Sequence, residues 1–243
     1  MHFSLFKTWV IARRELQSFF NSLMAYVIII TFLGFTGFFT WIYGTDIFLI
    51  NQASLRSFFD ISYWTLFFFI PAITMRMISE DNKTGTIDFL IAKVKTIEIV
   101  LGKFLSCIIL LSIILAFTLP YYFSVSRLGN IDNASVICGY SGLILMSIMY
   151  ISIGIFASCI TDNQVISLII ALCTGIFFQL FFGLIADNSV GLTGEILYFL
   201  SIYSHFDNIS KGIIDSGDII YFFSFSIVFL YMAILVIDRR KSR

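Results

Sequence analysis

The sequence predicts an all-α integral membrane protein with six transmembrane helices. Of its 243 residues, 59% are hydrophobic and 12% are charged, whereas about 25% of residues are charged in a typical soluble domain. The mean hydropathy of the chain is +0.96. The strands of a membrane β-barrel would be segments of about 10 residues with alternating polarity, and no such segment occurs. Helices are therefore expected throughout.

Six apolar runs without charged residues are the expected spans, because a helix of about 20 apolar residues crosses the bilayer core. They cover residues 21–44, 61–75, 104–126, 134–160, 165–186 and 219–237. The second run is the shortest, and Pro71 predicts a kink in it because proline removes a backbone hydrogen bond. The first run is too long for a signal peptide and is expected to remain as a membrane helix.

The whole chain, residues 1–243, is interpreted as a single domain. Only 2 prolines occur, and no Ser- or Gly-rich linker marks a boundary. An even number of spans places both termini on one side of the membrane. Every Lys and Arg except Arg56, Arg127 and Lys211 falls on that side, and basic residues are retained in the cytoplasm. Both termini are therefore predicted to be cytoplasmic.

The apolar runs lack the residue types that several classes of membrane protein need, so those classes are disfavoured. The runs contain no Asp, Glu, Lys, Arg or His, and ion-coupled carriers usually need such groups at membrane depth. The chain has no HExxH and no GxxxxGK[ST] motif, so neither a metalloprotease nor an ATPase is expected. Four cysteines lie in the runs without metal-ligand spacing, and we expect them to be packing residues, with no metal site. They are Cys107, Cys138, Cys159 and Cys173.

The charged stretch 77–103 separates the second and third runs. It is too polar to cross the bilayer and too apolar for a solvated loop, which predicts helices at a surface. Gly85 suits a turn and Thr86 suits the cap of a helix that carries Asp88 in its first turn. A second short helix over 96–104 is expected to lead into the third run. Two readings stay open: an amphipathic stretch on the lipid surface, or a helix that docks a soluble partner.

The N-terminal segment, residues 1–20, predicts an amphipathic surface helix before the first run. The alternative is a basic tail that only fixes the orientation of the chain. Apolar residues fall at helical spacing and charged residues lie between them: Phe3, Phe6, Trp9, Val10 and Phe20, with Lys7, Arg13, Arg14 and Glu15. The residues expected to matter most in this helix are Phe6, Trp9, Arg13, Arg14 and Glu15.

The outer segment 187–218 contains an apolar piece that is too short to cross the bilayer, so one or two short helices are expected there. They would close the outer end of the bundle or serve only as a packing cap. Thr36 and Gln179 are polar residues within the runs and are candidates for a translocation path. Ordinary hydrogen bonds between or within helices are the alternative role for both.

Three stretches of the sequence resemble those of type 2 ABC transporter permeases. "RMISEDNKTGTIDFLIAKVKTIEIVLGKF" resembles the first cytoplasmic loop of that family, although Asp88 replaces the more usual Glu and Val94 replaces a proline. "SCITDNQVIS" is similar to the short turn between the fourth and fifth spans. "HFDNISKGIIDSGDIIYFF" resembles the outer segment of the gliding-motility-associated branch.

The resemblance implies a permease subunit in the bacterial cytoplasmic (inner) membrane that is not itself an enzyme. A separate ABC ATPase subunit would bind ATP and Mg, so this chain needs no cofactor of its own. A second six-span chain, identical or homologous, would pair with it. Segment 1–20 would be the elbow helix and 77–103 the coupling loop. The implied ATPase-coupling residues are Glu80, Asp81, Gly85, Thr86, Ile87, Asp88, Phe89, Leu90, Asp162, Asn163 and Gln164.

Among the coupling residues, the apolar Ile87, Phe89 and Leu90 are expected to be the buried anchors in the ATPase. Three functions remain: an ABC exporter permease, an ABC-type complex that transmits force to periplasmic or envelope partners without cargo, and an ATP-independent membrane scaffold. The lipid membrane is an expected partner of all three, and nucleic acid of none.

Overall fold

The computed structural model describes residues 4–42, 54–187, 191–213 and 215–241. Within those residues every regular element is a helix, and six helices are long and apolar enough to cross a membrane. The predicted fold class, an all-α protein with six membrane-crossing helices, is thereby confirmed. The six candidate spans cover Leu23–Trp41, Arg56–Thr84, Thr96–Ser126, Asn133–Ile160, Gln164–Ile185 and Ser216–Arg240.

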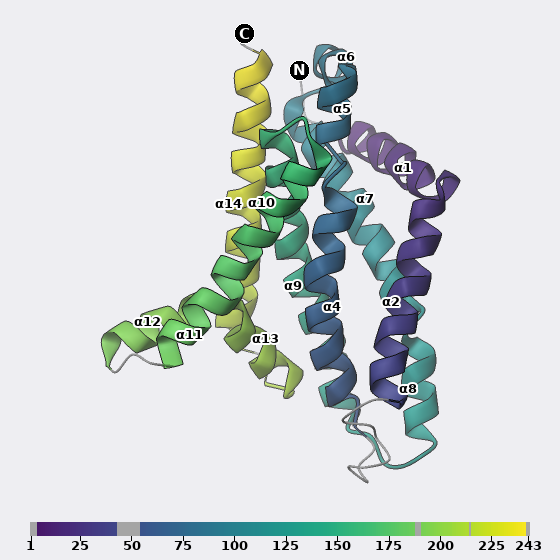
Figure 1. Ribbon diagram of the computed structural model, residues 1–243, viewed down its shortest axis with the longest axis vertical. Helices are drawn as coiled ribbons and strands as arrows, with labels where there is room; N and C mark the ends of the chain where they lie inside the picture. The colour runs from purple at the N-terminus through teal and green to yellow at the C-terminus, as the bar shows by residue number, and fades with distance from the viewer. Residues whose placement is uncertain (1–3, 43–53, 188–190, 214, 242–243) are drawn as a thin grey trace.

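The bundle is organised around α9 (Asn133–Ile160), the most buried of the six spans. It packs against α4 (Arg56–Thr74), α7 (Thr96–Ala116), α10 (Gln164–Ile176) and α14 (Ser216–Lys241). The first span, α2 (Leu23–Trp41), packs on α4 and α7 instead. Figure 1 shows α2 and α10 on opposite sides of α4.

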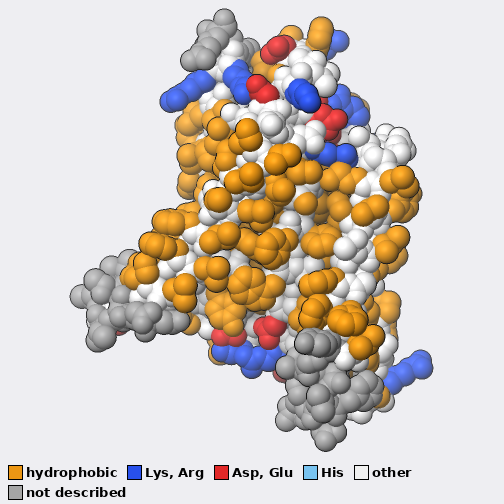
Figure 2. All heavy atoms as spheres, in the orientation of Figure 1, with side chains coloured by type: hydrophobic (Ala, Val, Ile, Leu, Met, Phe, Trp, Pro, Cys, Tyr) orange, Lys and Arg blue, Asp and Glu red, His pale blue; other side chains and the backbone are white. Residues whose placement is uncertain are grey.

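Charged and apolar side chains are separated along the long axis of the molecule. Figure 2 shows apolar side chains over the waist of the bundle and Lys, Arg, Asp and Glu gathered toward its two ends. The first helix, α1 (Leu5–Asn21), lies at the same end as the close of α14 and the loop helices α5 and α6 (Figure 1). We call this the terminal end, and the other the opposite end.

The charged stretch between the second and third spans forms a helical hairpin at the terminal end. Its two helices are α5 (Ser79–Thr84) and α6 (Thr86–Lys93), joined at Gly85 with φ 73°. That left-handed conformation favours glycine, as expected for the turn. The prediction that Thr86 caps α6 is wrong, because Gly85 occupies the N-cap position and the Thr86 hydroxyl donates to Asp81 Oδ1 instead.

The third span begins earlier than expected. The separate short helix predicted over 96–104 is not formed, since α7 runs without a break from Thr96 to Ala116. Glu98 accepts a hydrogen bond from the Lys95 amide and so closes the first turn of the helix. As a result Lys103, expected at the edge of a loop, lies within a long helix. After a break at 117–118, α8 (Leu119–Ser126) completes the span.

The remaining elements follow the predicted order with shifted limits. The second span starts at Arg56 and passes through Pro71 before α4 ends at Thr74. The fifth span continues from α10 through one turn of π-helix, η1 (Phe177–Phe181), into α11 (Phe182–Asp187). Two short helices, α12 (Leu192–Leu200) and α13 (Ile202–Ser210), occupy the predicted outer segment.

The first helix crosses the start of α7 at very short range. A Cβ added at Gly102 would lie 2.8 Å from Ile11 Cβ and 3.0 Å from the Thr8 carbonyl oxygen. Only glycine leaves room for this approach, which holds α1 against α7. By contrast, a Cβ added at Gly34 on α2 would meet nothing within 4 Å.

Gly102→Ala is therefore expected to destabilise the protein by about 1–3 kcal/mol, because the added methyl group must push α1 away. Gly34→Ala is the matched control and should be neutral or slightly stabilising, since alanine is the better helix former. Thermal unfolding of the two variants in detergent, followed by size-exclusion chromatography, compares them. Equal melting temperatures for both would contradict the tight approach of α1 to α7.

Candidate functional site

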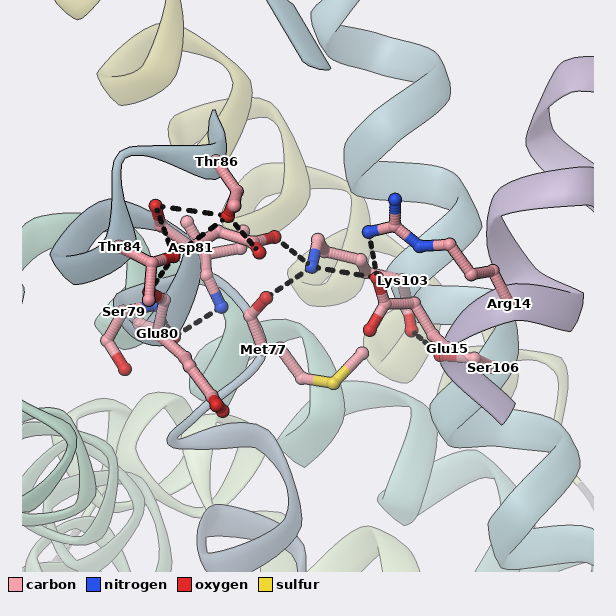
Figure 3. A network of polar contacts seen from close by, with 12 residues as sticks. Arg14, Glu15, Met77, Ser79, Glu80, Asp81, Thr84, Thr86, Lys103 and Ser106 are labelled. Atoms are coloured by element: carbon pink, nitrogen blue, oxygen red, sulfur yellow. Dashed lines mark hydrogen bonds and ion pairs between the residues drawn. The ribbon is translucent and has the colours of Figure 1, made fainter. Parts of the chain in front are cut away.

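A buried lysine lies at the terminal end, beneath the α5–α6 hairpin. Lys103 is 1% exposed although it carries a full charge. Its Nζ lies 2.6 Å from Asp81 Oδ2 and 3.3 Å from Glu15 Oε1, and it donates to the Met77 carbonyl oxygen at 2.5 Å. Figure 3 shows these contacts converging on one nitrogen. We refer to these four residues as the Lys103 cluster.

The Lys103 cluster surrounds the ammonium group with two hydrogen-bond acceptors and one ion-pair partner. An ammonium has three N–H donors, and three oxygens surround it here. Each oxygen comes from a different place in the fold: Glu15 from α1, Asp81 from α5 and Met77 from the turn after α4. A buried charge is tolerated only when it is paired and hydrogen-bonded in this way. The cluster therefore holds α1, α5 and α7 in one arrangement.

Further polar contacts extend the Lys103 cluster toward the surface. Arg14 lies 3.0 Å from Glu15 Oε1, and Thr86 donates to Asp81 Oδ1 at 2.7 Å. A hollow of about 310 Å³ opens beside these groups. Its polar walls include Arg76 and Glu80, and the Arg76 guanidinium lies over the Phe19 ring at 4.9 Å. The hollow is thus lined by groups from α1, the hairpin and α7.

The central helix α9 fixes the start of the hairpin. Ser158 Oγ accepts hydrogen bonds from the amides of Ile78 and Ser79, both at 2.9 Å, and donates to the Met75 carbonyl oxygen at 3.0 Å. The amides of a helix start have no partners within the helix. Here the acceptor for these amides is a serine hydroxyl from another span. Helix α5 is therefore attached to α9 as well as to α7.

Two more contacts tie α7 to its neighbours at the terminal end. Glu98 Oε1 accepts from the Ser4 amide at 2.7 Å, at the start of α1. The Thr96 hydroxyl donates to Asp238 Oδ1 on α14 at 2.5 Å. Together with the Lys103 cluster, these bonds join the hairpin and three helices from distant parts of the sequence.

The two faces of α6 differ. Ile87 and Ile91 are buried in the core of this chain, and Leu90 packs partly against it. Phe89 is 75% exposed, and Asp88 beside it is exposed too. Ile87 is thus engaged within the chain rather than free as an anchor for a partner. Phe89 is the large apolar side chain of α6 that remains available.

The hairpin lies next to the turn between α9 and α10. A groove of about 630 Å³ is lined by Lys83 at the end of α5 and by the residues Thr161, Asp162, Asn163, Gln164 and Val165 of that turn. The turn is held in shape because Asn163 caps α10 and Asp162 pairs with Arg240 at 3.0 Å. The structure therefore brings together two predicted coupling segments that are far apart in the sequence.

The predicted elbow residues divide into two groups. Arg14 and Glu15 join the contacts around Lys103. Phe6, Trp9 and Arg13 are exposed on the outer face of α1. This division gives α1 one face toward the bundle and one face toward its surroundings.

The two candidates for a translocation path do not meet. Thr36 on α2 is buried and donates to the Phe32 carbonyl oxygen at 2.8 Å, an ordinary bond within one helix. Gln179 lies in the π-helical turn and accepts from the Tyr150 hydroxyl at 2.5 Å. Its Nε2 is buried without a hydrogen-bond partner, and its side chain borders a cavity of about 200 Å³ with Trp64. Gln179 is thus the candidate that combines an unpartnered buried amide with a neighbouring cavity.

Sequence reasoning missed Lys103 and Ser158 as structural residues. Lys103 was placed only at the end of the charged stretch 77–103, and Ser158 was given no role. A lysine at the start of a long apolar run, preceded by the loop acids Glu80 and Asp81, could have indicated a buried ion pair. Within the described residues, no group of three or more His, Cys, Asp or Glu side chains could hold a metal ion.

Lys103→Met is expected to destabilise the protein by about 3 kcal/mol, because two carboxylates lose their counter-charge at a mostly buried site. Combining Lys103→Met with Asp81→Asn should cost less than the sum of the single changes, since the two residues interact directly. Arg14→Met, at an exposed position of the same network, is the control and should have a small effect. Strictly additive losses in thermal unfolding would contradict the pairing.

Comparison with known proteins supplies no family for this chain. No protein-family model matches it, and no curated protein matches it either. The similarity to type 2 ABC permeases thus stays a prediction based on the loop, the turn and the outer segment. Any assignment of function therefore rests on the contacts within this chain.

Proposed function

We propose that this chain is the membrane-spanning permease subunit of a type 2 ABC transporter that exports its substrate. It would lie in the bacterial inner membrane with both termini in the cytoplasm. A separate ATPase subunit would bind ATP and Mg and dock on the terminal end. The observation that carries the proposal is the α5–α6 hairpin, which exposes Phe89 while its base is tied to α7 and α9 by buried polar contacts.

Such a hairpin suits the transfer of force. A displacement of α6 reaches α5 through Gly85, and α5 is joined to α7 through Asp81 and Lys103. The same displacement reaches α9 through Ser158. Coupling between distant sites requires a contiguous series of rigid contacts of this kind. An ATPase that moves the hairpin would therefore move the spans.

The alternative, a hairpin that only rests on lipid, fits the contacts less well. Figure 1 shows α6 projecting past the start of α1, at the extreme of the terminal end. The groove beside it is lined by Lys83, Asp162 and Asn163, which suits a protein surface more than acyl chains. Phe89 would then be an anchor at the centre of a docking patch with a polar rim, the usual arrangement of a protein interface.

A second chain of the same type would complete the route through the membrane. The first and fifth spans have the smallest buried shares of the six, 28% and 22%. Lipid or another span would cover these apolar faces in the membrane. We propose that a second six-span chain, identical or homologous, covers part of them, so that the substrate crosses between the two chains.

Phe89→Asp is expected to abolish co-purification of the ATPase while the level of the chain in the membrane stays unchanged. The reason is that an unpaired charge in a packed interface is strongly penalised, whereas the exposed Phe89 contributes little to the fold. The measurement is recovery of the ATPase, and of its ATP hydrolysis, after gentle-detergent purification. The permease chain purified alone should show no hydrolysis.

Leu128→Asp provides the matched control, because Leu128 is 53% exposed at the opposite end. It should leave ATPase recovery intact. Ile87→Asp is the contrasting change and should lower the amount of folded chain, since Ile87 is buried in the core. Equal ATPase recovery with wild-type and Phe89→Asp chains at matched expression would overturn the docking role of the hairpin.

The orientation in the membrane is tested separately with reporter tags. A tag after Arg243 and a tag inserted within residues 83–95 are both expected to report the cytoplasm, because basic residues are retained there. A tag near Asn130 should report the outside. Protection of the first two from a cytoplasmic reagent, with labelling of the third, would reverse the assignment.

A further inference from the structure

A histidine is buried at the opposite end, where α12, α13 and α14 meet. His205 on α13 is 6% exposed. Its Nδ1 lies 2.5 Å from Asp218 Oδ1 on α14, and its Nε2 lies 2.7 Å from the carbonyl oxygen of Phe199 on α12. One imidazole ring therefore bridges two other helices with its two nitrogens.

These contacts fix the number of protons that the His205–Asp218 pair holds. A backbone carbonyl oxygen only accepts hydrogen bonds, so Nε2 must carry a proton to bond Phe199. The contact between Nδ1 and Asp218 needs one more proton, because two lone pairs would repel each other. A neutral imidazole beside an ionised carboxylate supplies only one of the two. The pair therefore holds two protons when both contacts are made.

The surroundings place both protons on the ring. Imidazole is a stronger base than a carboxylate, so the shared proton belongs to His205 by default. The Tyr221 ring is stacked on His205 with centroids 4.1 Å apart, and Phe199 meets it edge-on at 5.3 Å. Aromatic rings close to a cation stabilise it when their faces are presented to it, as that of Tyr221 is here. Asp218 Oδ1 is the carboxylate oxygen in contact with the ring, and its Oδ2 is buried without a hydrogen-bond partner.

We propose that His205 is a buried imidazolium and that its ion pair with Asp218 is a pH-sensitive latch, which holds α12 and α13 against α14 and loosens as the pH rises. When His205 loses one proton, one of its ring nitrogens no longer has a hydrogen to donate. The hydrogen bond to the Phe199 carbonyl oxygen or the one to Asp218 is then lost. The stabilisation is thus present while both protons are bound and is lost toward alkaline pH. This inference does not depend on the proposed transport function.

Other titratable groups also lie on the packed elements, and among them the Tyr63 hydroxyl is buried without a hydrogen-bond partner. Among the described residues they include Glu195 and Tyr198 on α12, Tyr203, Asp207 and Lys211 on α13, Tyr221 on α14, Arg56, Asp60 and Tyr63 on α4, and Tyr140 and Tyr150 on α9. The Tyr221 hydroxyl donates to the Leu200 carbonyl oxygen at 2.8 Å. Asp207 pairs with Lys211. Asp218 is the acid in contact with the ring.

The protonation state is measured directly by nitrogen NMR of ¹⁵N-histidine in the full chain. The sequence contains 2 histidines, so His2→Gln leaves His205 as the single signal. Two protonated ring nitrogens are expected near neutral pH, with conversion to a neutral ring as the pH is raised. A neutral ring with one proton near neutral pH would overturn the proposal.

Asp218→Asn tests the latch itself. The Asn amide is able to donate to Nδ1 of a neutral ring whose Nε2–H still bonds Phe199, so both contacts survive with one proton fewer. In the native chain, hydrogen exchange of the α13 amides should accelerate about tenfold relative to α8 in the same sample as the pH is raised, the change expected for loss of one charge-assisted hydrogen bond. In Asp218→Asn this relative acceleration should disappear. Its persistence in the variant, or its absence in the native chain, would contradict the latch.

Discussion

The positive charge of Lys103 is the constraint on which the terminal end depends. An ammonium group taken out of water needs oxygens on every side, and no single helix of this chain supplies them. Glu15, Asp81 and the Met77 carbonyl oxygen meet the need together. The first helix and the hairpin therefore have one relative position in which the charge is satisfied. Because this buried contact fixes the position of the hairpin, it also fixes the position of the exposed Phe89 on α6.

Much of the fold could be predicted because the bilayer imposes a strong pattern on the sequence. Runs of apolar residues between charges located all six spans, and the turn at Asn163 and the short helices α12 and α13 were expected where they occur. Boundaries were less accurate wherever a charge lies inside a helix. Arg56 begins α4 and Lys103 belongs to α7, since both side chains find acidic partners. The π-helical turn around Gln179 leaves no trace in composition.

The candidate site was predictable in its parts but not in its connections. The stretch 77–103 carries charge, turn residues and apolar residues, which indicated helices at a surface. Which of its apolar residues face inward depends on the direction from which α7 and α9 approach, and Ile87 and Phe89 therefore could not be told apart. The role of Ser158 depends on a contact between residues far apart in the chain. Tertiary geometry, rather than local propensity, decided both.

The order of synthesis gives the Lys103 cluster a consequence for biogenesis. The ribosome makes Glu15 first, Asp81 next and Lys103 last, so both acids already exist when the third span enters the membrane. That span carries a charge near its start, and the charge is neutralised only once the earlier segments have folded around it. Pairing of the Lys103 charge thus links insertion of the third span to closure of the loop. A chain that fails at this step retains an unpaired charge at the membrane surface and is destabilised, and destabilised chains are the ones that cellular proteases remove.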